Sequence, residues 1–126
     1  MQNFNAMFLK QLLWVGLGGM IGTIFRFLVG TAIRNTQFPL ATLVVNLSGS
    51  FLIGLFMGWY LRQAIGSDGK LLLVTGICGG FTTLSALSWE NFQLLQEGRY
   101  GVLIIYTLIT VIGGIGCVAL GYYFSK

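Results

Sequence analysis

Four long apolar stretches separated by short polar connections fill most of this 126-residue chain. A helix needs about 20 apolar residues to cross about 30 Å of hydrocarbon. We expect the helices at about residues 9–33, 40–62, 71–96 and 100–124, within one domain spanning residues 1–126. The sequence thus predicts an all-α, multi-pass membrane protein. Helical spans also indicate a bacterial inner membrane, since outer-membrane proteins are closed barrels.

The charges give these helices no clear orientation. With the N-terminus on side one, that side carries four Lys and Arg residues and side two carries three, namely Lys10, Arg62, Lys70 and Lys126 against Arg26, Arg34 and Arg99. The balance of Lys and Arg across short loops orients membrane helices, and a difference of one does not decide it. Such a chain can insert both ways round, and the two orientations can pair as an antiparallel, dual-topology homodimer.

Small residues recur at helical spacing, as in the pairs Gly18 with Gly22 and Gly76 with Gly80. This spacing lets helices approach each other closely in lipid. The pattern leaves open whether these pairs pack helices within one subunit or between the two subunits of a dimer.

The residue types that most catalytic and metal sites use are scarce. The chain has no histidine and only three acids, Asp68, Glu90 and Glu97. This composition argues against an enzyme and against a transition-metal site. The seven Lys and Arg residues are spread singly along the chain, so we expect no nucleic-acid partner.

The third apolar stretch contains GICGGFTTLSALS, residues 76–88, where two adjacent glycines precede a run of Thr and Ser residues. Each glycine costs a helix about 1 kcal/mol against alanine, so we predict that two half-helices meet at Gly79 and Gly80. Broken helices survive in a bilayer where their freed backbone groups are buried or line a wet cavity. Ser85 and Ser88 then present hydroxyls along one side of the second half, or bond back to their own helix.

Two further polar side chains lie at membrane depth. Arg26 is about seven residues from the end of the first helix, and Asn46 about seven residues into the second, so both lie about 10 Å below the same face, at a depth that allows them to share one cavity. Arg26 faces that cavity, snorkels to the surface or pairs with Glu90. Asn46, beside Thr42, either bonds between helices or donates its NH₂ group to a dehydrated anion.

Glu90 lies near the end of the third stretch, where it caps a vestibule or neutralises an arginine. Tyr106 and Thr110 add hydroxyls at helical spacing on the fourth stretch. The resulting track offers hydrogen-bond donors and has no acid at the centre of a span. Donors without carboxylates favour a small anion over a cation.

Two other functions remain open from the residues. A small multidrug-type exporter needs a membrane-embedded carboxylate, for which Glu90 is the only candidate near a span. A structural or assembly subunit needs none of the polar residues for transport, so it predicts that replacing Asn46 with leucine is harmless in a folded protein.

Three segments resemble the Fluc family of fluoride channels, also called CrcB proteins. They are GxxxRxxxG around Arg26, TLVVNLxG from Thr42 to Gly49, and GxCGGFTTxSxxSxE from Gly76 to Glu90. The resemblance covers all four helices in order. It implies a dual-topology homodimer with two antiparallel pores that passively exports fluoride from the cytoplasm.

The resemblance also implies roles for individual residues. Asn46 would line the pore and Arg26 would help to form an electropositive vestibule, while the backbone carbonyls of Gly79 and Thr82 would hold a structural Na⁺ at the dimer interface. Backbone oxygens suit such a hard cation. The other matched residues of the vestibule or polar track are Thr42, Ser85, Ser88, Glu90, Tyr106 and Thr110.

The chain departs from the family at one point. The family usually reads TTFSTFS, whereas this chain reads TTLSALS, with Leu84 and Leu87 in place of two phenylalanines. Leucine lacks the positive edge of an aromatic ring, so we expect weakened conduction. Three explanations stay open, which are a homodimer conducting through other donors, a chain that needs a second subunit carrying the phenylalanines, and an altered variant. We favour the homodimer.

Overall fold

The computed structural model describes residues 2–34 and 37–126. These residues form helices joined by short connections, with no strand among them. Four stretches are long and apolar enough to cross a membrane, which confirms the predicted all-helical class. The elements are α1 (Gln2–Ala32), α2 (Leu40–Leu61), α3 (Ser67–Lys70), a π-helical segment η1 (Leu71–Cys78), α4 (Gly79–Phe81), α5 (Leu84–Gln96) and α6 (Tyr100–Phe124). The third stretch comprises α3, η1, α4 and α5.

Two helices begin earlier than the sequence predicts. Helix α1 begins at Gln2, seven residues before the expected start, and the third stretch begins at Ser67, four residues before it. Hydropathy detects only the apolar part of a helix, whereas these first turns are largely polar and contain no proline. Phe4 and Phe8, one turn apart, stack with ring centroids 6.4 Å apart.

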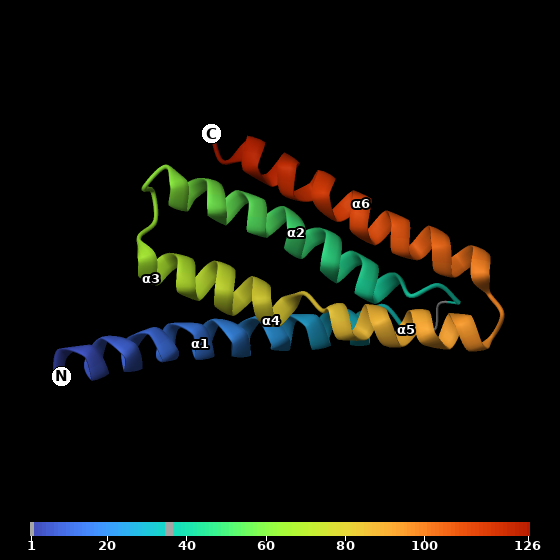
Figure 1. The fold of residues 1–126 in the computed structure, drawn as a ribbon, viewed down its shortest axis with the longest axis horizontal. Coiled ribbons are helices and arrows are strands. Elements are labelled where there is room, and N and C mark those ends of the chain that lie inside the picture. The colour runs from blue at the N-terminus through green and yellow to red at the C-terminus, as the bar shows by residue number, and fades with distance from the viewer. Residues whose placement is uncertain (1, 35–36) are drawn as a thin grey trace.

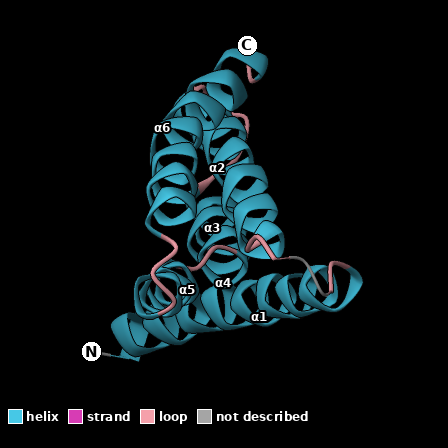
Figure 2. Ribbon diagram, turned by 90° about the vertical axis from the view of Figure 1, so that its right-hand side faces the viewer, coloured by secondary structure: helices cyan, strands magenta, loops and turns pink. Residues whose placement is uncertain are grey.

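Successive stretches run in opposite directions, so both termini and the connection from α2 to α3 lie at one end of the molecule (Figure 1). The connection from α5 to α6 lies at the other end. Helix α2 packs mainly against α6, and α1 packs mainly against η1 and α4. Figure 2 shows α2, α3 and α6 stacked above α1, which crosses beneath them.

Glycines set the distance between the paired helices. A Cβ atom on Gly54 of α2 would lie 2.0 Å from the carbonyl oxygen of Val118 on α6, and one on Gly18 of α1 would lie 2.8 Å from the Cα atom of Gly76. Both gaps are too short for any side chain. These small residues therefore pack helices within the subunit, which decides a question that their spacing alone leaves open.

We expect Gly54→Ala to destabilise the protein, because the added methyl group meets backbone and must push α2 from α6. Overpacking of this kind costs about 1–3 kcal/mol. Gly116→Ala on α6 is the matched control, since its Cβ would meet nothing within 4 Å. Thermal unfolding in detergent should show a lower midpoint for Gly54→Ala alone. Equal midpoints would contradict the close α2–α6 contact.

A small apolar core lies where α2, α5 and α6 meet. It consists of Leu43, Leu87, Leu94 and Tyr106, and the Tyr106 side chain is fully buried. Most other large apolar side chains on α1 and α6 are exposed, for example Leu13 and Ile115. Such a surface suits a chain whose solvent is lipid, because apolar groups gain nothing there by being buried.

Candidate ion pathway

The third stretch leaves the helical path at two threonines. Helix α4 ends at Phe81, Thr82 and Thr83 have extended backbones, and α5 begins at Leu84. Gly79 and Gly80, where we expected the junction, remain helical in α4. One contribution is local, since Thr83 is the N-cap of α5 and its Oγ1 accepts a hydrogen bond from the Ala86 N–H at 3.2 Å. Threonine is a favoured N-cap, and its branched side chain suits extended backbone.

Asn46 of α2 binds both free backbone groups of Thr83. Its Nδ2 donates to the Thr83 carbonyl at 3.1 Å, and its Oδ1 accepts from the Thr83 N–H at 2.8 Å. The amide thus replaces the helical bonds that the extended residues lose. An asparagine amide carries two N–H groups, and the bond to Thr83 uses one of them, so the interhelical bond and a donor role are both available to Asn46.

Two hollows lie on either side of Thr83, which lines both. The first has a volume of about 380 Å³ and is lined by Arg26, Gly30, Ala41, Thr42, Val45, Thr83, Ser85 and Ala86. The second has a volume of about 290 Å³ and is lined by Asn46, Ser50, Ile53, Thr82, Thr83, Leu84, Leu87, Thr110 and Val111. Arg26 lines the first hollow and Asn46 the second, so the two residues do not line the same hollow of the subunit. Thr83 belongs to the lining of both.

Arg26 is half-buried at the wall of the first hollow. The ion pairs of the described residues join Lys10 with Asp68 and Arg99 with Glu97. The pairing of Arg26 with Glu90, one of the sequence-based alternatives, is not among them. The guanidinium therefore gives the first hollow a positive charge that no carboxylate of the described chain neutralises.

Glu90 is bound by hydroxyl groups from two other helices. Thr42 Oγ1 donates to Glu90 Oε1, and the Tyr106 hydroxyl donates to Glu90 Oε2, each at 2.6 Å. Such short distances are typical of hydrogen bonds to a charged acceptor. Glu90 thus joins α5 to α2 and α6. It also lines a third hollow of about 140 Å³, together with Arg99 and Glu97.

The remaining predicted hydroxyls have different surroundings. Thr110 is buried, and its Oγ1 bonds back to the Tyr106 carbonyl at 2.7 Å. Ser85 Oγ lies 3.1 Å from Thr83 Oγ1 at the first hollow. Ser88 is exposed and lines none of these three hollows. Thr83, which contacts Asn46 and lines both hollows, is not one of the predicted site residues, although a threonine directly before a helical segment is an N-cap signal.

Leu84 and Leu87 occupy different environments. Leu84 is 75% exposed at the first turn of α5, whereas Leu87 is 7% exposed and belongs to the core that includes Tyr106. Both line the second hollow. A larger ring fits freely at position 84 but must be accommodated by neighbours at position 87.

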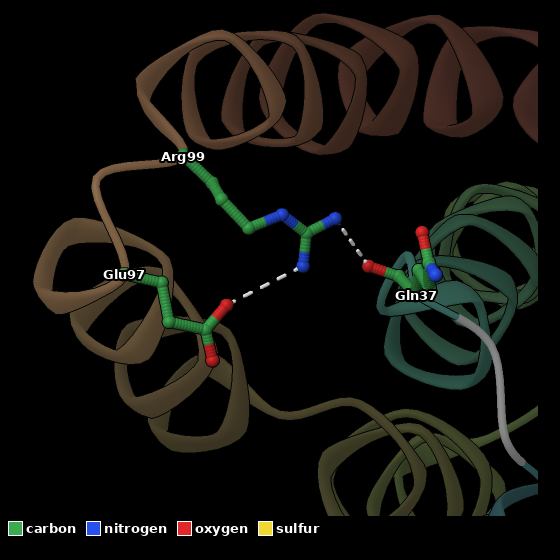
Figure 3. A network of polar contacts seen from close by, with 3 residues as sticks. All are labelled: Gln37, Glu97 and Arg99. Carbon is green, nitrogen blue, oxygen red and sulfur yellow. Dashed lines mark hydrogen bonds and ion pairs between the residues drawn. The ribbon is translucent and has the colours of Figure 1, made fainter.

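Arg99 makes polar contacts at the end of the molecule where α5 connects to α6 (Figure 3). Its Nη2 donates to the Gln37 carbonyl at 2.7 Å, and its Nη1 lies 3.4 Å from Glu97 Oε2. These contacts tie the start of α6 to the connection before α2 and to the end of α5. They neutralise part of the Arg99 charge at the entrance of the third hollow.

Comparison with known proteins identifies relatives along nearly the whole chain. Residues 13–122 match the family model described as CrcB-like protein, Camphor Resistance (CrcB). A protein of Azobacteroides pseudotrichonymphae named fluoride-specific ion channel FluC is 45% identical, over 94% of this chain and 98% of its own length. A Geobacillus kaustophilus protein named fluoride-specific ion channel FluC 1 is 39% identical, over 90% of this chain and 97% of its own length.

Proposed function

We infer, from the premise that this chain belongs to the CrcB-like family, that it is a fluoride-specific ion channel in a membrane it crosses several times. The observation that carries this function is the Asn46–Thr83 pair, which stabilises an extended segment at membrane depth, and Thr83 lines two hollows. The physiological role would be passive export of fluoride from the bacterial cytoplasm across the inner membrane.

We propose that fluoride enters through the hollow beside Arg26. The positive charge attracts the anion. The hydroxyls of Thr83 and Ser85 bond to each other, which leaves one of their two O–H groups to donate to the anion in place of its hydration water. The free N–H of Asn46 continues the path into the second hollow. Ion pathways of this kind balance attraction against release by using several weak sites in sequence.

Glu90 would position hydroxyl groups beside the pathway rather than bind the anion. Its carboxylate holds the hydroxyls of Thr42 and Tyr106, and both of those residues sit on helices that line the hollows or the core beside them. A carboxylate that is already bound by two donors presents less free negative charge to a passing anion than an unpaired one.

We also propose that two copies pair as an antiparallel, dual-topology homodimer with a structural Na⁺ between them. Because the Thr83 N–H is used by Asn46, it cannot close the helical bond to the Gly79 carbonyl four residues earlier. Gly79 is exposed, and the extended backbone of Thr82 turns its carbonyl out of the helical ladder. Carbonyls of these two residues from both subunits fit the oxygen ligands that a hard cation takes.

The test of the function is fluoride efflux from liposomes containing the purified protein, with chloride as the control anion. We expect fluoride to leave much faster than chloride, because compact donors compensate the dehydration of fluoride only when they fit it. Equal rates for the two anions would contradict a homodimeric fluoride channel. So would the absence of efflux from a protein that a thermal unfolding measurement shows to be folded.

A heteromeric channel is the second candidate. Leu84 and Leu87 replace the phenylalanines expected at these positions, and two relatives carry the numbered names FluC 1 and FluC 2. A chain of this type would conduct only with a second subunit. Liposomes with this chain alone would then release no fluoride, and efflux would appear on adding that subunit.

A further inference from the structure

A hollow of about 440 Å³ lies between the end of α2 and the start of α3, at the end of the molecule where both termini are found (Figure 1). Its lining residues are Tyr60, Leu61, Gln63, Ile65, Gly66 and Ser67. Leu61 is 63% exposed and continues the apolar outer surface of α2. Gln63 and Ser67 make the opposite side polar. A ligand that fits this hollow is therefore amphipathic.

A positive charge stands beside the hollow. The Lys70 ammonium lies 4.8 Å from the centroid of the Tyr60 ring, which forms part of the wall. Asp68, two residues away, is bound by Lys10 at 2.6 Å. Within the described residues no carboxylate pairs with Lys70, so its ammonium is available to an anion.

The same end carries two more cations that lie over tyrosine rings. The Arg62 guanidinium is 5.2 Å from the Tyr122 ring centroid, and the Lys126 ammonium is 5.0 Å from that of Tyr123. Tyrosines at helix ends sit at the level of the lipid head groups. The rings therefore hold these positive charges at the depth of lipid phosphates, and basic pockets at that depth bind anionic head groups.

We propose that this hollow binds an anionic phospholipid. The lipid phosphate would contact Lys70 and the Ser67 hydroxyl, while the glycerol and the first part of an acyl chain would lie along Leu61 and Ile65. Gln63, whose φ of 61° is unusual for a residue other than glycine, turns the chain at the rim and so shapes the site.

Among the described residues, the hollow at the opposite end has a different lining. There Arg99 is held by Glu97 and by the Gln37 carbonyl (Figure 3). The hollow beside it is lined by the carboxylates of Glu90 and Glu97, which repel a lipid phosphate. The hollow beside Arg99 is therefore less suited to a lipid phosphate than the one beside Lys70.

Native mass spectrometry of the purified full chain tests this proposal. Protein in detergent would be titrated with phosphatidylglycerol or with phosphatidylcholine of the same acyl chains, for the wild type, Lys70→Gln and Arg99→Gln. We expect the wild type to retain phosphatidylglycerol preferentially. Lys70→Gln should lose about fivefold in affinity for it, the effect of one cation near an anionic lipid surface, while Arg99→Gln should bind as the wild type does.

Thermal unfolding of the three proteins ensures that only folded protein is compared. Equal retention of the two lipids by the wild type would overturn the proposal, as would unchanged affinity in folded Lys70→Gln or an equal loss in Arg99→Gln. Competition by millimolar inorganic phosphate as strong as that by the lipid would also overturn it, since it would indicate a site for free phosphate.

Discussion

Asn46→Leu is expected to stop fluoride efflux, with a loss of about a hundredfold or more. Leucine removes the donor to the Thr83 carbonyl and the acceptor for the Thr83 N–H. Leucine also removes the second N–H, the proposed donor to the anion, and a hydrogen bond to a charged group contributes about 1.5–3 kcal/mol. A rise of about 2.7 kcal/mol in the barrier already gives a hundredfold lower rate. Efflux of fluoride from liposomes measures the effect.

Asn46→Asp removes the donor with a smaller change in shape than Asn46→Leu and keeps the acceptor for the Thr83 N–H. Aspartate has nearly the same shape and keeps an oxygen for the Thr83 N–H, but it has no NH₂ group and its charge repels an anion. We expect a folded protein without fluoride efflux. Folded Asn46→Asp that conducts at the wild-type rate would contradict a role for the Asn46 donor.

Asn91→Leu is the matched control for these changes. Asn91 also joins two helices, since its Nδ2 donates to Thr107 Oγ1 at 2.9 Å. It lines neither of the two hollows beside Thr83. We therefore expect Asn91→Leu to lower the thermal midpoint modestly and to retain fluoride efflux. The comparison distinguishes an asparagine in the ion pathway from one that serves only to pack helices together. In a purely structural subunit, Asn46 would have only the second role.

Replacing Leu84 and Leu87 together with phenylalanine is expected to raise fluoride efflux about tenfold. Both positions line the second hollow, and the electropositive edges of aromatic rings there would be able to contact an anion. A gain of about 1.4 kcal/mol at the barrier, within reach of two such contacts, corresponds to a factor of ten. Initial efflux rates at equal protein density measure the gain.

The single substitutions should differ in their effect on stability. Leu84→Phe adds a ring at a position that is 75% exposed, so the thermal midpoint should hardly change. Leu87→Phe enlarges a side chain packed in the core with Tyr106, and overpacking there costs about 1–3 kcal/mol.

A double substitution that is folded and no faster than the wild type would show that the aromatic pair is dispensable. A silent wild type with an active double substitution would favour the heteromeric channel.

The sequence alone determines the helical class, the four apolar stretches and the polar residues at membrane depth. These features depend on local composition, because a helix satisfies its own backbone in lipid whatever its neighbours are. The family resemblance likewise rests on short local segments around Arg26, Asn46 and Thr82. The antiparallel dimer and its Na⁺ remain predictions.

Only the tertiary structure decides how these residues meet. The extended segment lies at Thr82 and Thr83 because Asn46 of another helix supplies the bonds that it lacks. Glu90 binds Thr42 and Tyr106 instead of an arginine, because the rotation of α2 and α6 about their axes brings those hydroxyls to it. Sequence spacing places a residue at a depth along its helix, but the direction in which it faces another helix follows from the glycine contacts and core packing that set each helix's rotation.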